Sequence, residues 1–178
     1  SGRSSAIANE LGAIKVMKFP SLGMYKIPDE LRWCPQAVRE FFTERQGSNV
    51  ITPTTIEAYG LPITYGIGGI HYAIKEFEGD DLMYVDVQSM YPNIMINYDL
   101  FSRAIAYKSR YINWVREREQ AKKDGDKLKD AELKLKVNSV YGLMKADWCP
   151  LYDPYMASSI SVMGQVLMTI LIGGLVSA

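Results

Sequence analysis

A pair of helical segments joined by a short polar turn constrains the fold of this chain more than any other feature. The residue pattern predicts one helix over about 102–123 and a second over about 127–145. Between them, Asp124-Gly125-Asp126 predicts a turn, and Leu128 stands where a calcium loop would need an oxygen ligand. Two helices joined so closely pack in opposite directions. We therefore expect an antiparallel helical hairpin and no calcium site there.

Shorter runs outside the hairpin predict strands and two further helices. Residues 70–77 and 82–87 are rich in β-forming side chains and flank an acidic turn, so we expect an antiparallel strand pair. A helix is predicted over 30–45, and an apolar helix over 157–172 that ends at Gly173-Gly174. Strands grouped apart from the helices indicate an α+β fold.

Length and composition suit one folded unit or a piece of a larger protein. The chain has 178 residues, of which 48% are hydrophobic, and this is enough to bury a core. We divide it into residues 1–60, of uncertain role, 61–101 with the strands, 102–145 with the hairpin, and 146–178 with the apolar helix.

Two features bear on the compartment in which the protein works. The apolar run 160–172 is shorter than the ~20 residues that a membrane span needs and contains Gln165, so we expect a buried helix and no membrane partner. Cys34 and Cys149 lie far apart and outside any Cys-x-x-Cys pair, which favours reduced thiols over a disulfide framework or a zinc site. Both features favour a cytoplasmic protein.

Charge is unevenly distributed along a chain whose formal net charge is zero. Residues 103–136 hold 11 Lys/Arg against 6 Asp/Glu, a net of +5, and the remainder carries a net of −5. A locally basic segment indicates a surface that meets an anion such as phosphate or nucleic acid. A solvated helix face laced with ion pairs has the same composition, so charge alone leaves both interpretations open.

Asp86 stands directly after a run of apolar residues, where a carboxylate is costly to bury unless it is paired or binds a metal ion. At the end of a strand it could point into a cleft and bind Mg²⁺, which prefers oxygen ligands. A carboxylate bound to turn amides is the alternative. Taken alone, Asp86 does not decide between them.

The predicted hairpin carries cations on faces that could meet. Lys134, Asn138 and Tyr141 follow one another at helical spacing and share a face of the second helix. Arg118 and Lys122 lie one turn apart on the first helix. Two helices that present cations to one gap could hold a polyphosphate, whereas each residue taken singly also fits a solvated basic face.

Two sequence motifs resemble signatures of family B DNA polymerases. The run Asp86 to Pro92 is similar to Asp-x-x-Ser-Leu-Tyr-Pro, with Met90 in place of Leu. The run Lys134 to Gly142 matches Lys-x-x-x-Asn-Ser-x-Tyr-Gly at every fixed position, and the two motifs come in the order of the family. Residues 151–157 also resemble polymerases of tailed bacteriophages and prophages. The resemblance covers about residues 60–172 and is weak before them.

The first motif implies roles in metal binding and sugar choice. Asp86 would be the catalytic carboxylate that binds both Mg²⁺ ions, with help from the backbone carbonyl of Val87. Tyr91 would stack under the incoming sugar and exclude a 2′-hydroxyl, and so select deoxynucleotides.

The second motif and the first helix imply a nucleotide-binding surface. Lys134 would hold the triphosphate, Asn138 would lie beside the nascent base pair, and Tyr141 would line the same pocket. Arg118 and Lys122 match an Arg-x-x-x-Lys pattern of the family, for which Arg116 offers a competing register.

The resemblance also implies partners and a place within a larger enzyme. Gly68 and Gly69 are similar to a template-binding glycine loop, although Tyr65 lies one residue too far upstream to match its tyrosine. The chain would then comprise a partial palm with antiparallel strands, a fingers hairpin and a C-terminal apolar palm helix. DNA primer-template, a deoxynucleoside triphosphate and the remainder of the polymerase chain are the expected partners, in the cytoplasm of a bacterium or a phage-infected host.

One expected motif is missing from the sequence. Family B sites use a second carboxylate motif of the Asp-Thr-Asp type, which does not occur here. We therefore expect this chain to be inactive alone. A non-catalytic nucleic-acid-binding module that retains polymerase motifs is the alternative hypothesis.

Overall fold

The chain folds into helices and one small sheet, in agreement with the mixed α and β class predicted from the sequence. The computed structural model describes residues 2–20, 22–48 and 52–178. In chain order the helices are α1 (Gly2–Glu10), the 3-10 helix η1 (Asp29–Trp33), α2 (Gln36–Arg45), α3 (Met90–Asn97), α4 (Lys108–Lys123), α5 (Lys127–Leu143) and α6 (Pro154–Ser177). The strands are β1 (Thr54–Ala58), β2 (Leu61–Tyr65) and β3 (Ile70–His71).

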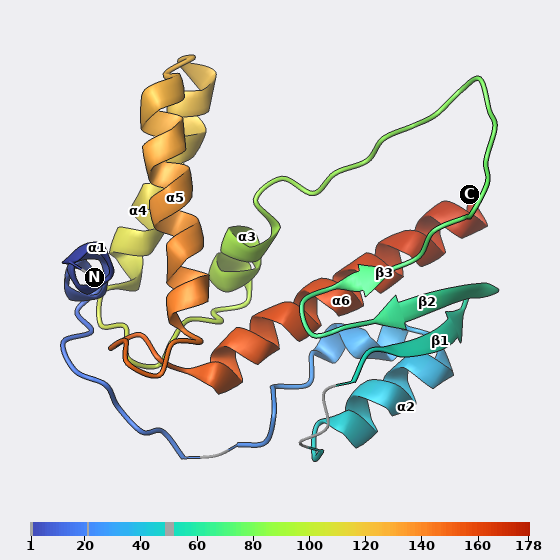
Figure 1. Ribbon diagram of the computed structural model, residues 1–178, viewed down its shortest axis with the longest axis horizontal. Helices are drawn as coiled ribbons and strands as arrows, with labels where there is room; N and C mark the ends of the chain where they lie inside the picture. Colours follow the sequence, from blue (N-terminus) through green and yellow to red (C-terminus); the bar gives the residue numbers. More distant parts are fainter. Residues whose placement is uncertain (1, 21, 49–51) are drawn as a thin grey trace.

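The predicted helical hairpin is confirmed and stands out from the rest of the molecule (Figure 1). At its tip Gly125 adopts a positive φ of 72°, which lets the chain reverse within two residues. Asp126 then caps α5, because its side chain accepts a hydrogen bond from the amide of Lys129 at 3.0 Å. At the base of the hairpin, Tyr111, Val137 and Val140 are fully or almost fully buried against α1 and α3.

Helix α6 runs obliquely across the molecule, from below the hairpin to the side that carries the sheet (Figure 1), and joins two hydrophobic cores. Ala157, Ile160 and Met163 belong to the core that also contains the base of the hairpin. Val162 and Val166 belong to the core under the sheet and α2. Residues 1–60, of uncertain role in the sequence, therefore contribute α1 to the first core and η1, α2 and β1 to the second.

The sheet is antiparallel in the order β1-β2-β3. Tyr59 and Gly60 link β1 to β2 with positive φ angles of 55° and 77°, which suit a two-residue hairpin turn. This turn pairs Ala58 with Leu61, and Ile63 and Tyr65 of β2 are fully buried.

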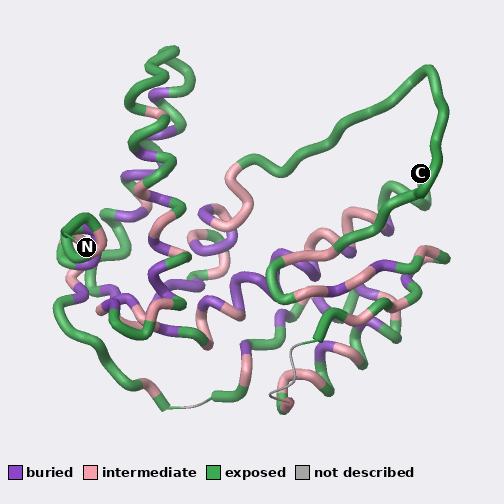
Figure 2. The backbone as a smooth tube through the Cα atoms, viewed as in Figure 1, coloured by how far each residue is buried: buried purple, intermediate pink, exposed green. Residues whose placement is uncertain are grey.

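The predicted strand pair over 70–77 and 82–87 is wrong. Only Ile70 and His71 form a strand, which pairs with β2, and residues 72–87 have no strand or helix. Figures 1 and 2 show this segment as an exposed arch that leaves the body of the molecule. Leu82, Met83 and Tyr84 are 77%, 86% and 88% exposed. Pairing the two runs would give a hairpin whose apolar faces have no described neighbour to cover them, and such a hairpin is marginal.

Several helix boundaries also differ from prediction. The helix expected over 30–45 is split into η1 and α2, because Pro35 lacks an amide proton and holds Cys34 extended. Helix α4 starts at Lys108 instead of 102, since the amides of Ala106 and Tyr107 bond to Leu11. Helices α1 and α3 were not predicted. Pro92 lies in the first turn of α3, where proline is tolerated.

Helix α6 is longer than predicted and continues through both glycines that were expected to end it. Gly173 is buried against the ring of Tyr59, and a methyl group there would clash with Cζ of that ring, so the glycine serves close packing. With 24 residues, α6 is the helix among the described residues that is long and apolar enough to cross a membrane, so the length argument from the sequence is wrong. A core helix of a soluble protein can be equally long and apolar, and 56% of an apolar 18-residue stretch of α6 is buried inside the molecule.

Candidate functional site

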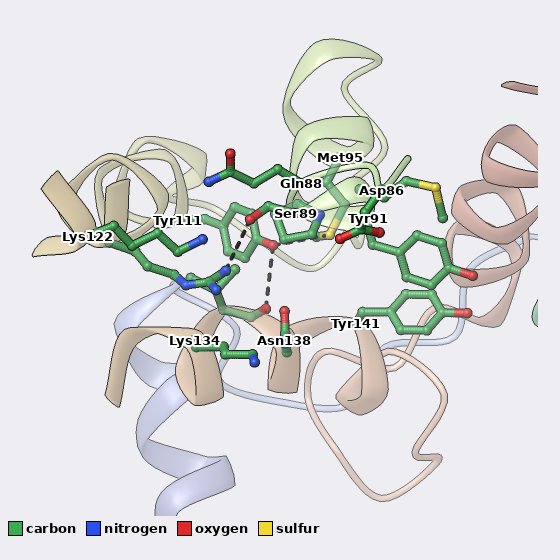
Figure 3. Close-up of a pocket in the computed structure, with 14 residues that line it drawn as sticks. Asp86, Gln88, Ser89, Tyr91, Met95, Tyr111, Lys122, Lys134, Asn138 and Tyr141 are labelled. Carbon is green, nitrogen blue, oxygen red and sulfur yellow. Dashed lines mark hydrogen bonds between the residues drawn. The ribbon is translucent and has the colours of Figure 1, made fainter. Parts of the chain in front are cut away.

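A cavity of about 720 Å³ lies between the hairpin and α3 (Figure 3). It is lined from the extended segment and α3 by Asp86, Gln88, Ser89, Met90, Tyr91, Pro92 and Met95. From the hairpin it is lined by Tyr111, Arg118, Lys122, Lys134, Val137, Asn138 and Tyr141. Residues of both sequence motifs therefore meet at one cavity, although more than 40 positions separate Asp86 from Lys134.

Cations gather at one end of this cavity. Lys122 from α4 and Lys134 from α5 both line it, and in Figure 3 they lie on the side away from the rings of Tyr91 and Tyr141. Neither lysine forms an ion pair within the described part of the chain. Two unneutralised ammonium groups on facing helices suit an anion that reaches between them.

Arg118 is held by other protein groups. It is 8% exposed, and its Nε donates to Oδ1 of Asp130 at 2.9 Å while its NH1 donates to the hydroxyl of Ser89 at 3.1 Å. Arg118 lines the cavity and Arg116, the competing register, does not. Asp130, which the sequence analysis did not single out, thus ties α5 to α4 and orients the guanidinium.

The turn before α3 has a strained backbone. Ser89 has φ 50° and ψ 46°, the left-handed region, which costs a residue other than glycine roughly 1 kcal/mol or more. This conformation redirects the chain from the extended segment into α3, so that Asp86 and Tyr91 both reach the cavity. The hydrogen bond from Arg118 to the Ser89 hydroxyl fastens this turn to the hairpin.

Two tyrosines form the other end of the cavity. The rings of Tyr91 and Tyr141 lie 4.7 Å apart between centroids and are tilted by 54° (Figure 3). The Tyr91 hydroxyl donates to the carbonyl of Gly68 at 2.8 Å. Burial, together with the neighbouring Tyr141, raises the pKa of Tyr91 above its ordinary value, so its hydroxyl stays protonated at neutral pH. The half-buried Tyr91 ring is thus anchored at its polar end.

A second cavity of about 260 Å³ adjoins the first, and the two share Asp86, Met90 and Tyr91. The other lining residues are Gly68, Gly69, Ile70, Val85, Val87, Ser161, Gly164, Gln165 and Met168. Every residue for which the sequence predicted a role therefore lies on one of these two cavities.

Helix α6 contributes residues that the sequence analysis missed. Ser161, Gly164, Gln165 and Met168 fall at helical spacing and line the second cavity together. The signal was present in the sequence, because Gln165 interrupts an apolar run and a buried amide needs hydrogen-bond partners. It was interpreted only as evidence against a membrane span.

The metal-binding capacity of the cavities is limited to one carboxylate. Asp86 is the acidic residue among the described side chains that line them, and it is exposed. No cluster of three or more His, Cys, Asp or Glu occurs within the described residues. Mg²⁺ commonly binds to one or two carboxylates together with substrate phosphates, so Asp86 fits a shared site and not a cage made by this segment alone.

Comparison with known proteins adds no relative. No protein-family model, curated protein or solved structure matches this chain. The resemblance to family B DNA polymerases therefore rests on the two motifs.

Proposed function

We propose that this chain is part of a DNA-directed DNA polymerase of family B, which adds deoxynucleotides to a primer 3′ end. The hairpin α4–α5 would be the fingers, and α3, α6 and the sheet would belong to the palm. The observation that carries the proposal is the meeting of two polymerase-like motifs, distant in sequence, at one cavity with cations at one end and tyrosines at the other.

The cationic end suits the triphosphate of an incoming nucleotide. Lys122 and Lys134 would neutralise it from two helices and fix its position, which is the main contribution that a protein makes to phosphoryl transfer. Arg118, already paired with Asp130, would shape this end and contribute less free charge.

The carboxylate would hold metal ions between the nucleotide and the primer. Asp86 and the carbonyl of Val87, together with phosphate oxygens, would bind Mg²⁺. The ions would supply stabilisation of the attacking oxygen and of the leaving pyrophosphate. Two-metal sites of this kind use a further carboxylate, which we propose is supplied from elsewhere in the parent polypeptide.

The tyrosine end suits the sugar. The ring of Tyr91 would lie beneath the deoxyribose and leave no room for a 2′-hydroxyl, and Asn138 and Tyr141 would line the pocket of the nascent base pair. The loop that carries Gly68 and Gly69 would contact the template. A cytoplasmic location, with access to DNA, follows from this function.

Metal-dependent binding of a nucleotide tests the proposal. The protein should bind a deoxynucleoside triphosphate more tightly with Mg²⁺ than with EDTA, as measured by isothermal titration calorimetry. Lys134→Ala should weaken binding about tenfold, since it removes one charge-assisted contact. Lys129→Ala is the matched control, because Lys129 is exposed on the same helix but does not line the cavity.

The same measurement separates the alternative function. Under either hypothesis the basic hairpin should bind DNA in a salt-dependent manner, so DNA binding alone does not separate a polymerase from a non-catalytic module. If the protein binds DNA but shows no metal-dependent affinity for a deoxynucleoside triphosphate, the binding-module hypothesis is correct and the polymerase hypothesis is wrong.

A further inference from the structure

Helix α6 presents three residues from one of its faces to the proposed sugar pocket. Ser161, Gly164 and Gln165 are spaced so that they share one face of the helix. The Ser161 hydroxyl is hydrogen-bonded to the hydroxyl of Tyr141. The other two positions support Tyr91, one through packing and the other through a loop.

Gly164 forms the floor under Tyr91. A methyl group added there would lie 3.2 Å from Cε1 of the Tyr91 ring and 3.4 Å from Cε of Met90. The distance to Tyr91 is tighter than ordinary packing and the distance to Met90 is at its lower limit, so a methyl group at position 164 would push the Tyr91 ring away from α6 by a few tenths of an ångström.

Gln165 clamps the glycine loop. Its side chain is 3% exposed, and its Nε2 donates to the carbonyl of Gly66 at 2.7 Å. The amide of Gly66 in turn donates to the carbonyl of Gly69 at 2.9 Å and closes the loop that contains Gly68. The carbonyl of Gly68 accepts the hydrogen bond of the Tyr91 hydroxyl. Gln165 is therefore connected to the polar end of Tyr91 through one short turn of backbone.

The oxygen of the same amide is exceptional. Oε1 of Gln165 is buried and has no hydrogen-bond partner among the described residues. Burying an unpaired acceptor costs free energy, which a purely structural position in an apolar helix would avoid with Leu or Met. The hydrogen bond from Nε2 of Gln165 to the carbonyl of Gly66 explains why a glutamine occupies this position.

We propose that Gln165, with Gly164 beside it, is a positioning residue for sugar discrimination. It fixes the loop that anchors Tyr91 and so sets how closely the Tyr91 ring approaches the sugar. The inference rests on the proposed function, because it assigns a partner to the residue that would exclude the 2′-hydroxyl. Small displacements matter here, since a shift of about 1 Å at a pocket wall can change rates strongly.

The test compares incorporation of a ribonucleotide and the matching deoxynucleotide by the complete enzyme. Gln165→Met keeps the length and apolar stem of the side chain but removes the bond to Gly66. The ribo-to-deoxy ratio of kcat/KM should rise about fivefold, the effect expected when one buried hydrogen bond is lost. Ser159→Ala is the matched control, because Ser159 is equally buried on α6 but accepts its bond from Lys26, away from the loop. This control should leave the ratio unchanged.

A double-mutant cycle with Tyr91→Phe separates positioning from general loss of stability. Tyr91→Phe keeps the ring and removes the hydroxyl that bonds to Gly68, so it breaks the same connection. Gln165→Met should then change the ratio less than twofold in the Tyr91→Phe background. Full multiplication of the two effects would overturn the inference, and so would an unchanged ratio in Gln165→Met.

Tyr91→Ala distinguishes failure of the inference from failure of the proposed function. If Tyr91→Ala raises the ratio and Gln165→Met does not, the inference alone is wrong. If Tyr91→Ala leaves the ratio unchanged, the proposed sugar role and the inference fail together. Should Gln165→Met not fold, Gly164→Ala replaces it. Its methyl group presses on the Tyr91 ring and should raise KM for the deoxynucleotide with little change in kcat, and an unchanged KM would refute the inference.

Discussion

The α4–α5 hairpin and a strand pair over 70–77 and 82–87 were both predicted from residue patterns, but only the hairpin forms as predicted, and residues 72–87 are instead an extended segment. A helix satisfies its backbone hydrogen bonds within itself, and the hairpin needs only a two-residue turn and a cap to bring its helices together. A strand depends on the backbone of a neighbour. No described residue provides that neighbour for residues 72–87, and their apolar side chains stay exposed. Local order can thus be inferred from a local pattern, whereas strand pairing cannot.

The extended segment and the hairpin also differ in what they contribute to the candidate site. The extended segment contributes little buried surface but supplies Asp86 and Val87, which line the two cavities. The hairpin supplies both buried packing and the lysines at the cationic end. Substitutions in the segment should therefore affect chemistry without affecting stability, and substitutions in the hairpin base should affect stability.

The largest expected effect comes from the segment. In the complete enzyme, Asp86→Asn should reduce primer extension by roughly 10³-fold or more, because metal-ion stabilisation of the transition state contributes several kcal/mol. Single-turnover incorporation with Mg²⁺ measures this loss. The midpoint of urea unfolding should stay the same, since Asp86 is exposed.

Asp81→Asn provides the control for this substitution. Asp81 is an exposed carboxylate on the same segment and lines neither cavity, so its loss should leave extension unchanged. Robust extension by Asp86→Asn would remove Asp86 from the chemistry and leave the segment without an assigned role.

A matched pair of leucines gives the next largest effect and tests the comparison directly. Leu133 of α5 is 9% exposed in the first core, whereas Leu82 of the segment is 77% exposed. Leu133→Ala should lower the free energy of unfolding by about 2–3 kcal/mol. Leu82→Ala should change it by no more than about 0.5 kcal/mol. Urea denaturation of both variants measures the difference, and equal losses would mean that the segment is packed in solution.

The sequence predictions were accurate for features that depend on neighbouring residues and inaccurate for contacts between distant residues. The turn at Gly125, the cation face with Lys122 and Lys134, and the grouping of Asp86 with Tyr91 all depend on residues close in sequence. The two lysines, Asp86 and Tyr91 line one cavity. The contacts of α6 with Tyr91 and with the glycine loop join residues 73 or more positions apart and could not be predicted from spacing. Gly173 was mistaken for a helix end because its packing partner, Tyr59, lies more than 100 positions away in the sequence.

A matched pair of glycines gives the smallest expected effect. Gly125 turns the hairpin with φ 72°, and its neighbourhood has room for a methyl group, so Gly125→Ala costs only backbone strain. We expect a loss of about 1 kcal/mol in the free energy of unfolding. Gly79 lies in the segment, and a methyl group there would meet only the movable ring of Phe77. Gly79→Ala should therefore change stability by less than about 0.5 kcal/mol. Thermal unfolding of the two variants resolves this difference, and a larger loss for Gly79→Ala would show that residues 72–87 adopt a fixed turn that the exposed arch does not require.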